Sequence, residues 1–381
     1  MKLLHFADVH LGVTIYGVLD GKTGLNSRII DFLDAMDCVC DVAEATKPDL
    51  ILFAGDAFRN RTPVPTLVTH FANRIQRMAD VAPVVMVVGN HDRQKGGEGR
   101  KHSIDVMREL KAKNQIYVSD SIEAIHFDHS HIITLPWTYD ENADSIFESI
   151  NSCLKTVKDD LPCILLSHAA LEGAQYNENY IADLSVEEVL PLWLFCNECF
   201  DYVALGHIHK HQEMCPNVVY SGSLERVDWG EKDDPKGFIL ADVDGTTKYR
   251  FVDVHPRPMI EIETNWDDLD AIQDIDVTDA IVKVSIKSKK AIGYQMAISE
   301  VEKLLDGYWL LDSVQVISSE ERERRQAWGK TVHLEALDVY GLLKIYFTDR
   351  YPTDKKKVKV LLKAADKVIQ MVNDNDFSKE D

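Results

Sequence analysis

The chain has 381 residues, of which 45% are hydrophobic and 28% are charged, which is typical of a globular protein with two or three domains. No apolar run reaches the roughly 18 residues that a membrane-spanning helix needs, so we expect no such helix. The formal net charge of −21 argues against a free-standing nucleic-acid binder, because contacts with phosphates need Lys and Arg. The charge is uneven, however: residues 261–279 carry eight acids and no base, whereas bases dominate residues 93–101.

The cysteines indicate a reducing compartment. There are seven, an odd and scattered set that argues against a disulfide framework and favours a cytoplasmic protein. The first residues turn acidic too soon for a signal peptide, which favours the same location. Cys196 and Cys199 form a single Cys-x-x-Cys pair. Because no second pair or nearby histidine completes a zinc set, two thiols packed on a short helix are favoured over a zinc site.

The first part of the chain predicts buried strands separated mostly by helices. Ile29, Leu33, Met36, Cys40 and Ala43 recur at steps of three and four, which predicts an amphipathic helix, and two further helices follow along the chain. Continuous apolar strands that alternate with helices indicate a largely parallel sheet arrangement covered on both faces. The predicted strands are 2–7, 50–54, 83–88, 132–135, 163–167 and 202–205, with further strands near 218–226 and 237–243, and the predicted helices are 29–43, 65–80 and 142–157.

Two further parts follow. Pro256 and Pro258 mark a boundary, after which strands at 259–263, 280–287 and 312–318 and helices at 266–272 and 294–306 predict a small α/β domain. The final part predicts two helices broken at Pro352, each with an apolar face. These faces either pack on their own domain or dock a partner helix, and the spacing leaves both interpretations open. The faces comprise Leu334, Leu337, Tyr340, Leu343 and Phe347, then Val358, Leu361, Leu362, Ala365, Ile369 and Val372.

Side chains that can bind metal follow the ends of five predicted strands. Ligand sites in parallel sheets lie outside the carboxyl ends of the strands, so these side chains should meet. The segment after residue 205 is typical: His207 and His209 point to one side of an extended backbone, and Gly206 permits a close bend. Each of these fragments alone is readily explained as a turn or as a core histidine. Five of them in this order favour a metal site. The candidate ligands are Asp8, His10, Asp56, Asn90, His168, His207 and His209.

The chemistry of these ligands indicates two divalent ions. Carboxylate, imidazole and amide oxygen without thiolate suit manganese, iron or zinc rather than a structural zinc site. Seven ligands exceed the needs of one ion, and a carboxylate can bridge two. Two ions roughly 3.5–4 Å apart can stabilise both the attacking and the leaving oxygen in phosphoryl transfer. His91 should lie beside them as a proton donor or charge stabiliser, whereas Asp92 is expected to orient the backbone or neighbouring side chains.

In order and spacing these motifs resemble the calcineurin-like metallophosphoesterase superfamily. They are Asp8-Val9-His10, Gly55-Asp56, Gly89-Asn90-His91-Asp92, His168 and Gly206-His207-Ile208-His209. The segments 8–12, 221–231 and 318–325 narrow the resemblance to SbcD-type nuclease subunits of DNA double-strand-break repair.

The resemblance implies an α/β fold, a two-sheet metallophosphoesterase sandwich flanked by helices, over residues 1–255. It implies a capping, DNA-selecting domain over 256–328 and a helix-loop-helix over 329–381 that docks an SbcC-type ATPase. The implied activity is manganese-dependent exonuclease and endonuclease cleavage of phosphodiester bonds at DNA ends or hairpins, by a homodimer. One manganese would be held by Asp8, His10, Asp56 and His209, the other by Asp56, Asn90, His168 and His207, with His91 as the catalytic histidine.

Basic residues near the site are candidates for DNA contact. Many relatives have His three places after the bridging Asp, where this chain has Arg59, which either contacts a phosphate in bidentate fashion or is a solvated loop charge. The loop with Arg93, Lys95, Arg100 and Lys101 should add local positive potential. Two other functions stay open: a binuclear metallophosphoesterase acting on nucleotides or phosphoproteins, and a non-catalytic scaffold of a DNA repair complex.

Overall fold

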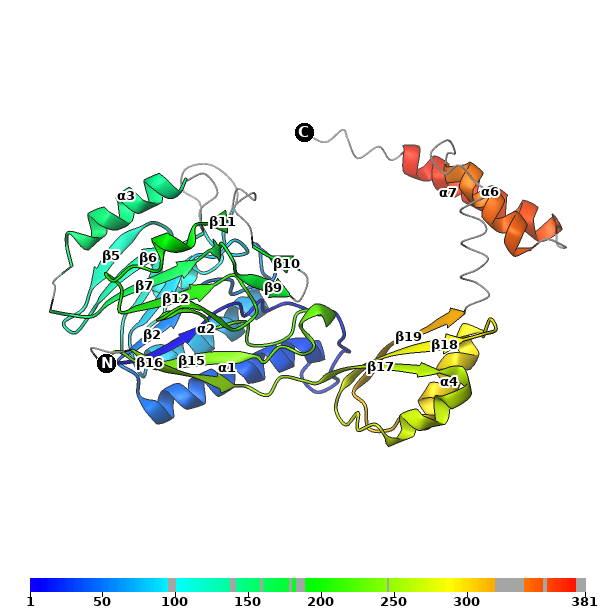
Figure 1. The fold of residues 1–381 in the computed structure, drawn as a ribbon, viewed down its shortest axis with the longest axis horizontal. Helices are drawn as coiled ribbons and strands as arrows, with labels where there is room; N and C mark the ends of the chain where they lie inside the picture. The colour runs from blue at the N-terminus through cyan, green and yellow to red at the C-terminus, as the bar shows by residue number, and fades with distance from the viewer. Residues whose placement is uncertain are drawn as a thin grey trace. The chain divides into compact units, whose positions relative to one another are not determined.

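The structure is a computed structural model that describes residues 1–94, 101–137, 142–157, 160–177, 180–182, 189–244, 247–318, 339–351 and 355–374 (Figure 1). The chain divides into two compact units. The first comprises Met1–Glu261, Asp276–Lys283 and Asp306–Ser313. The second comprises Ile262–Ile275, Val284–Leu305 and Val314–Asp381.

One six-stranded sheet of the first unit has the order β16-β15-β1-β2-β3-β4. The strands β1 to β4 run parallel, and β15 and β16 add antiparallel pairings at one edge. Two helices, α1 and α2, make the crossovers between β1, β2 and β3. The bounds are β1 Lys2–Phe6, α1 Ser27–Thr46, β2 Leu50–Phe53, α2 Pro65–Ala79, β3 Val84–Val87, β4 Ile116–Ser119, β15 Gly237–Asp242 and β16 Lys248–Asp253.

The second six-stranded sheet has the order β13-β14-β12-β7-β6-β5, with four parallel strands at its centre and antiparallel strands at both edges. Its bounds are β5 Glu123–His126, β6 His131–Leu135, α3 Ala143–Leu154, β7 Cys163–His168, β12 Tyr202–Gly206, β13 Gln212–Cys215 and β14 Val218–Tyr220. Shorter elements are η1 Asp105–Glu109, β8 Ala170–Leu171, β9 Gln175–Asn177, β10 Tyr180–Ile181, β11 Val189–Leu190, η2 Leu192–Leu194 and η3 Trp229–Glu231.

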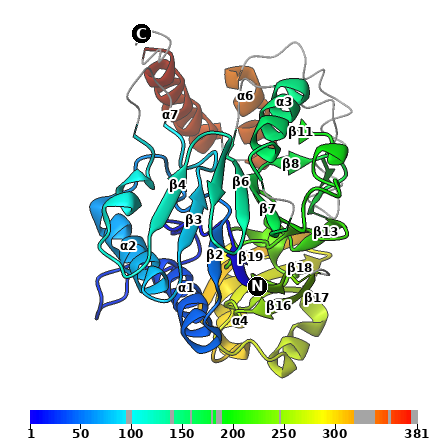
Figure 2. The same cartoon turned by 90° about the vertical axis from the view of Figure 1, so that its left-hand side faces the viewer.

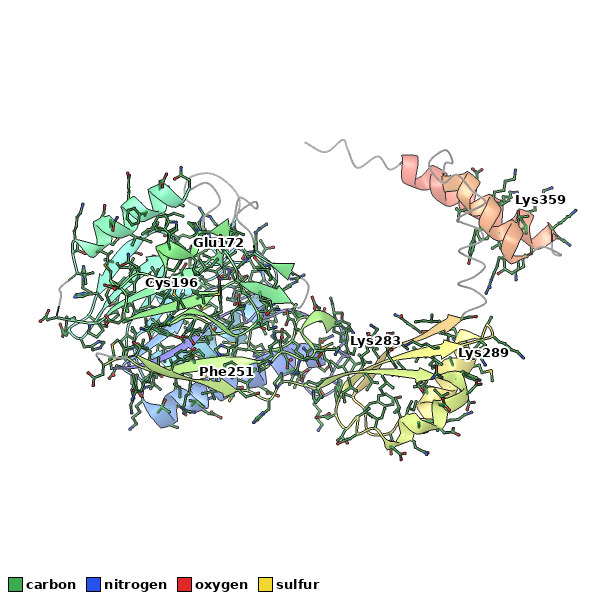
Figure 3. The ribbon with its side chains drawn as sticks, viewed as in Figure 1. Glu172, Cys196, Phe251, Lys283, Lys289 and Lys359 are labelled. Carbon is green, nitrogen blue, oxygen red and sulfur yellow. A yellow bond between two sulfur atoms is a disulfide. The ribbon has the colours of Figure 1, made fainter. Side chains whose placement is uncertain are left out.

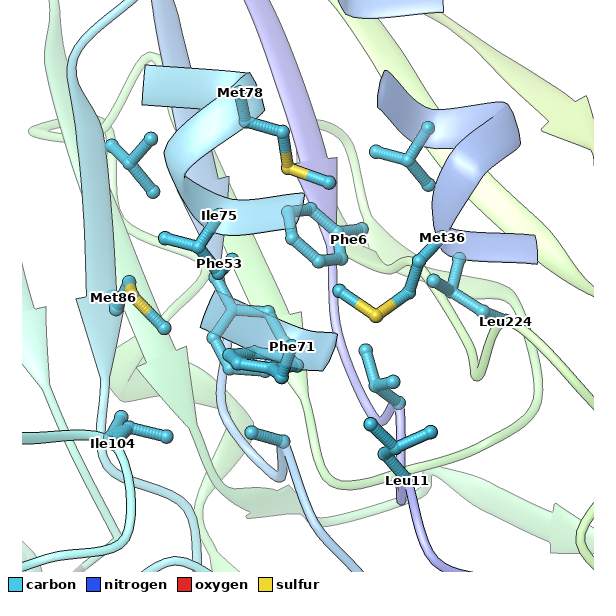
Figure 4. Close-up of a cluster of buried hydrophobic side chains, with 14 of the residues drawn as sticks. Phe6, Leu11, Met36, Phe53, Phe71, Ile75, Met78, Met86, Ile104 and Leu224 are labelled. Carbon is cyan, nitrogen blue, oxygen red and sulfur yellow. The ribbon is translucent and has the colours of Figure 1, made fainter. Parts of the chain in front are cut away.

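The two sheets pack face to face and carry helices on their outer faces (Figure 2). Leu52 of β2, Ile164 of β7 and Ala204 of β12 belong to the buried cluster between the sheets. On the other face of the first sheet, Phe53 packs with Phe71 of α2 in a second buried cluster (Figure 4). Because both faces of the central strands are buried, these strands read as continuous apolar runs in the sequence. The predicted two-sheet sandwich flanked by helices is confirmed.

The edges of the sheets differ from the prediction. The strands β4, β5, β13 and β16 were not predicted, because edge strands are short and partly polar. The predicted helix at 266–272 is a 3₁₀-helix, η4 (Trp266–Asp274), with non-helical dihedrals at Asp268. Short acidic side chains compete for backbone hydrogen bonds, which disfavours an α-helix there.

The cysteine prediction was wrong at one position. Cys196 forms a disulfide with Cys215 of β13, with the two Cα atoms 6.3 Å apart, rather than packing as a free thiol on a short helix (Figure 3). Cys199 is exposed and free. The partner lies 19 residues away and meets Cys196 only through the folding of the second sheet, so the Cys-x-x-Cys spacing could not reveal it.

The later elements match the predicted order. The strands β17 (Met259–Asn265), β18 (Ile281–Ser288) and β19 (Leu310–Ser318) form a three-stranded sheet with β18 in the middle, and α4 (Tyr294–Leu304) follows β18. Two contacting helices follow, α6 (Val339–Arg350) and α7 (Lys355–Asp374).

Leu343 and Phe347 of α6 and Leu361 and Leu362 of α7 are half-buried. Leu334 and Leu337 lie outside the described residues, as does most of the 318–325 segment. Within the described residues, no helix is long and apolar enough to cross a bilayer.

Candidate metal centre

The structure gathers the seven candidate ligands at the carboxyl ends of strands from both sheets. Asp8 and His10 follow β1, Asp56 follows β2 and Asn90 follows β3. From the other sheet, His168 ends β7, and His207 and His209 follow β12. In three groups the possible ligand atoms lie within 4.8 Å of one another: Asp8 with His10 and His209, His10 with Asp56 and His91, and Asp8 with Asp56 and His168.

The first cluster forms around His10. Its Nε2 lies 2.8 Å from Nε2 of His209 and 3.5 Å from Oδ2 of Asp56. Nitrogen ligands lie about 2.1 Å from a bound transition metal, so two ligand atoms at adjacent corners of one ion are about 3 Å apart. The observed spacing fits two imidazoles that share an ion.

The second cluster forms around Asn90. Its Oδ1 lies 3.0 Å from Nε2 of His168 and 3.2 Å from Nδ1 of His207. Oδ1 of Asp56 lies 3.5 Å from the same His168 nitrogen. Asp56 therefore turns one carboxylate oxygen toward each cluster, which is the arrangement that a bridging ligand needs.

Most of the imidazoles are held by hydrogen bonds at the nitrogen that faces away from the clusters. Nδ1 of His168 donates to the carbonyl of Ala54 at 2.6 Å, and Nδ1 of His209 donates to Glu231 at 2.6 Å. Nδ1 of His10 is buried and has no hydrogen-bond partner within the described part of the chain. A backbone or carboxylate partner fixes the ring and presents the other nitrogen as a lone pair, as in known metal sites.

The candidate ligands differ in their charge states before an ion binds. Burial, and then the charge of His209, lowers the pKa of His10. Burial and the charge of His168 lower the pKa of His207 to about 3, so both rings are neutral donors. Burial alone would raise the pKa of Asp56, but the charge and hydrogen bond of His168 hold it well below its usual range. Burial alone would lower the pKa values of His168 and His209, but Asp56 raises that of His168 to about 9 and Glu231 raises that of His209. A divalent ion bound at these two rings would therefore displace a proton from each.

The backbone around the ligands is strained. Asp8, His10, Asp56 and His207 have φ values of 52°, 46°, 61° and 95°, in the left-handed region that residues other than glycine rarely adopt. Each such residue costs about 1–3 kcal/mol, and such residues cluster at functional sites. The amide of Asp8 donates to the carbonyl of Gly55 at 3.0 Å, which ties this segment to the loop after β2.

Glycines allow the strand ends to approach. A Cβ on Gly206 would lie 2.1 Å from the carbonyl oxygen of Ala54, and one on Gly55 would lie 2.5 Å from Nδ1 of His168. The predicted role of Gly206 in a close backbone approach is confirmed.

Asp92 holds the loops rather than the ions, as expected. Its buried carboxylate accepts hydrogen bonds from the amides of Asp56, Ala57 and Gly89 at 2.9, 3.1 and 3.2 Å, and from the hydroxyl of Ser103 at 3.0 Å. Burial, and then the charge of Asp56, raises its pKa to about 7.

We expect Asp92→Asn to lower the free energy of unfolding by about 1–3 kcal/mol, because the new amide would leave buried N–H donors unpaired. Urea unfolding of the metal-free protein measures this change. Asp128→Asn, at an exposed position, is the matched control. An unchanged midpoint for the Asp92 variant would contradict this role.

His91 lies beside both clusters. Its amide donates to Oδ1 of Asp56 at 2.8 Å, its Nδ1 donates to the carbonyl of Arg59 at 2.8 Å, and its ring meets the ring of His10 edge-on at 4.9 Å. This position suits a proton donor next to the ions. The short distances to His10 and Asp56 also suit a ligand, so geometry alone leaves the two roles open.

The basic candidates differ in their surroundings. Arg59 is exposed and lines the cavity over the ligands. Arg93 donates to the carbonyl of Trp137, and Lys101 is exposed. Lys95 and Arg100 lie outside the described residues.

Sequence reasoning gave no role to several residues of this cavity, which has a volume of about 330 Å³. The hydroxyl of Tyr176 on β9 lies 3.1 Å from Nε2 of His207. Glu231, at the end of the 221–231 motif, contacts His209. The motif pointed to this segment, but no signal in the sequence showed which of its side chains reaches a ligand.

Residues 1–211 match the calcineurin-like phosphoesterase family, and the chain belongs to this family. The matched range contains all seven candidate ligands. The protein is therefore a hydrolase of phosphate esters from a family that uses divalent metals.

The SbcD subunit of the nuclease SbcCD from Staphylococcus epidermidis is 25% identical over 286 residues, which cover 69% of this chain and 71% of that protein. This similarity supports the SbcD-type assignment made from the motifs. Among solved structures, TT1561 of Thermus thermophilus has a TM-score of 0.41 at 14% identity and covers 67% of this chain and 99% of that chain. A 5'-nucleotidase precursor from Thermus thermophilus has a TM-score of 0.35 at 14% identity, with coverage of 66% and 53%. Neither likeness is close enough to indicate a function.

Proposed function

We propose that this chain is the nuclease subunit of a DNA repair complex and hydrolyses phosphodiester bonds at DNA ends or hairpins with two manganese ions. The observation that carries the proposal is the placement of Asp56, whose two carboxylate oxygens face two separate ligand clusters. One ion would be held by Asp8, His10, Asp56 and His209. The other would be held by Asp56, Asn90, His168 and His207.

When bound, two such ions activate a water and stabilise charge on the phosphate oxygens. Side chains of the chain itself would transfer the proton and bind the phosphate. The carbonyl of Arg59 accepts a hydrogen bond from Nδ1 of His91, which leaves Nε2 of this ring for a proton transfer to the leaving oxygen. Tyr176 and Arg59 line the cavity where they can bind phosphate oxygens next to the scissile bond.

The proposed substrate is tested by cutting of end-labelled linear duplex and hairpin DNA with manganese, with and without an SbcC-type ATPase and ATP. Cyclic nucleotides and a phosphopeptide serve as comparison substrates under the same conditions. We expect metal-dependent cutting of the DNA. Faster turnover of a nucleotide or phosphopeptide would instead favour another phosphoesterase activity, and no turnover of any substrate would favour a scaffold.

The isolated chain should bind DNA weakly. With a net charge of −21, long-range attraction to phosphates is poor, and only the ions and a few cations such as Arg59 favour DNA locally. We expect a Kd of about 10⁻⁶ M or weaker at physiological salt, and stronger binding at low salt. Fluorescence anisotropy of labelled duplex over a salt series measures this. Nanomolar binding without a partner would contradict it.

The terminal helices are the proposed docking site for the ATPase. Tyr346 of α6 and Val360 of α7 expose 50% and 63% of their surface, which leaves apolar contacts for a partner. Deletion of residues 331–381 should leave hydrolysis of bis-p-nitrophenyl phosphate unchanged and abolish association with the ATPase in a pull-down. Recovery of the complex with the truncated chain would remove this role. The homodimer remains part of the same proposal. The cysteine argument for a cytoplasmic location does not hold with the Cys196–Cys215 disulfide present.

A further inference from the structure

A buried lysine, Lys236, contacts the candidate ligand His209. Lys236 is fully buried, and its Nζ donates to Oε2 of Glu231 at 2.8 Å, to the hydroxyl of Ser223 at 2.9 Å and to the carbonyl of His209 at 3.1 Å. All three protons of the ammonium group are therefore matched by acceptors. A buried charge is costly unless it is compensated in this way.

Glu231 joins this cation to the metal centre. Its Oε1 accepts from Nδ1 of His209 at 2.6 Å, and its Oε2 accepts from the amide of Val227 at 3.0 Å as well as from Lys236. Only 8% of Glu231 is exposed, so its carboxylate interacts with little screening by solvent. The imidazole and the ammonium group thus share one buried carboxylate.

The other imidazole ligands have neutral partners or none within the described residues. Nδ1 of His168 meets the carbonyl of Ala54, Nε2 of His207 meets the hydroxyl of Tyr176, and Nδ1 of His10 is unpartnered. His209 is therefore the candidate histidine ligand backed by a carboxylate at its distal nitrogen. The two ion sites therefore differ in the partners that hold their histidine ligands.

We propose that Glu231, held by Lys236, is a positioning residue that selectively strengthens the ion site of Asp8, His10 and His209. The carboxylate fixes the ring of His209 with Nε2 directed at the ion and makes this nitrogen a stronger donor. Lys236 compensates the carboxylate, so that the fold tolerates it before an ion binds. The inference rests on the proposed two-ion centre.

Calorimetric titration of the metal-stripped protein with MnCl₂ tests it, with electron paramagnetic resonance of free Mn²⁺ as a second readout. The wild type should bind two ions. Glu231→Gln keeps the shape of the side chain but removes its charge. It should therefore lower the affinity for one manganese ion about 10- to 100-fold and change the affinity for the other by less than about twofold. Asp233→Asn, which removes an exposed carboxylate of the same segment, is the control and should leave both affinities unchanged.

Lys236→Met provides an independent test with a different readout. It leaves the carboxylate of Glu231 uncompensated, so the metal-free protein should melt at a lower temperature, and manganese should restore more stability than in the wild type. Glu231→Gln should also melt at a lower temperature without metal, because it leaves the buried ammonium group of Lys236 uncompensated. Manganese should then restore less stability to this variant than to the wild type.

Equal manganese affinities in Glu231→Gln and the wild type would overturn the inference, and so would equal weakening of both ions. A wild type that binds no manganese would instead refute the two-ion centre itself.

Discussion

Replacement of His91 with alanine should abolish cleavage while both ions still bind. The ring lies beside the ligand clusters, and its Nδ1 is held by the carbonyl of Arg59, so its free nitrogen can serve the leaving oxygen. Loss of a general acid typically lowers the rate about 10²- to 10⁴-fold. The rate of bis-p-nitrophenyl phosphate hydrolysis and the manganese stoichiometry, measured on the same preparation, check this expectation.

The control is His129→Ala, which removes an exposed histidine at the turn between β5 and β6. It should leave rate and stoichiometry unchanged. Loss of one ion in His91→Ala would make His91 a ligand, because its ring nitrogen lies close enough to the ligand atoms of His10 and Asp56 to share an ion with them.

Asp56→Ala should remove both ions together. The two oxygens of Asp56 lie 3.5 Å from Nε2 of His10 and 3.5 Å from Nε2 of His168, one in each cluster. Mutation of a residue that hydrogen-bonds a metal ligand typically lowers the metal affinity 10- to 100-fold. Loss of the shared ligand itself should therefore lower the affinity for each ion by more than about 100-fold. Manganese titration of the metal-stripped variant measures both affinities.

Asp228→Asn is the matched variant, because Asp228 lines the same cavity but its carboxylate caps the amide of Gly230 rather than meeting a cluster. It should retain two ions. If Asp56→Ala kept one ion at wild-type affinity, the carboxylate would belong to a single ion and would not bridge.

The parts of the fold that could be predicted are those buried on both faces. Strands such as β2 and β7 are largely continuous apolar runs, and polar residues that the hydrophobic effect cannot explain lie just after β2, at Asp56, and at the end of β7, at His168. The contrast between the apolar strands and the polar residues near their ends identified the candidate ligands in the sequence. The edge strands β5 and β13 are partly exposed and mixed in character, so their sequences gave no comparable signal.

The remaining features depend on contacts between distant segments. The left-handed backbone of Asp8 and His207 arises because each loop must turn its side chain into a shared space. Glu231 meets His209 across 22 residues, and Cys196 meets Cys215 across 19. The guanidinium of Arg93 donates to a backbone carbonyl 44 residues away, a pairing that its sequence position did not indicate. Such pairings follow from tertiary structure and leave no periodic pattern.

The division of the ligands between the two sheets has a consequence for how the enzyme matures. Asp8, His10, Asp56 and Asn90 come from one sheet, and the three remaining histidines come from the other, at least 78 residues further along the chain than Asn90. Neither sheet alone supplies the complete ligand set, so full occupancy of both ion sites requires that the two sheets have docked. Metal that binds the complete site then stabilises the folded molecule relative to partly folded ones by mass action. We therefore expect phosphoesterase activity to appear only once both sheets have formed.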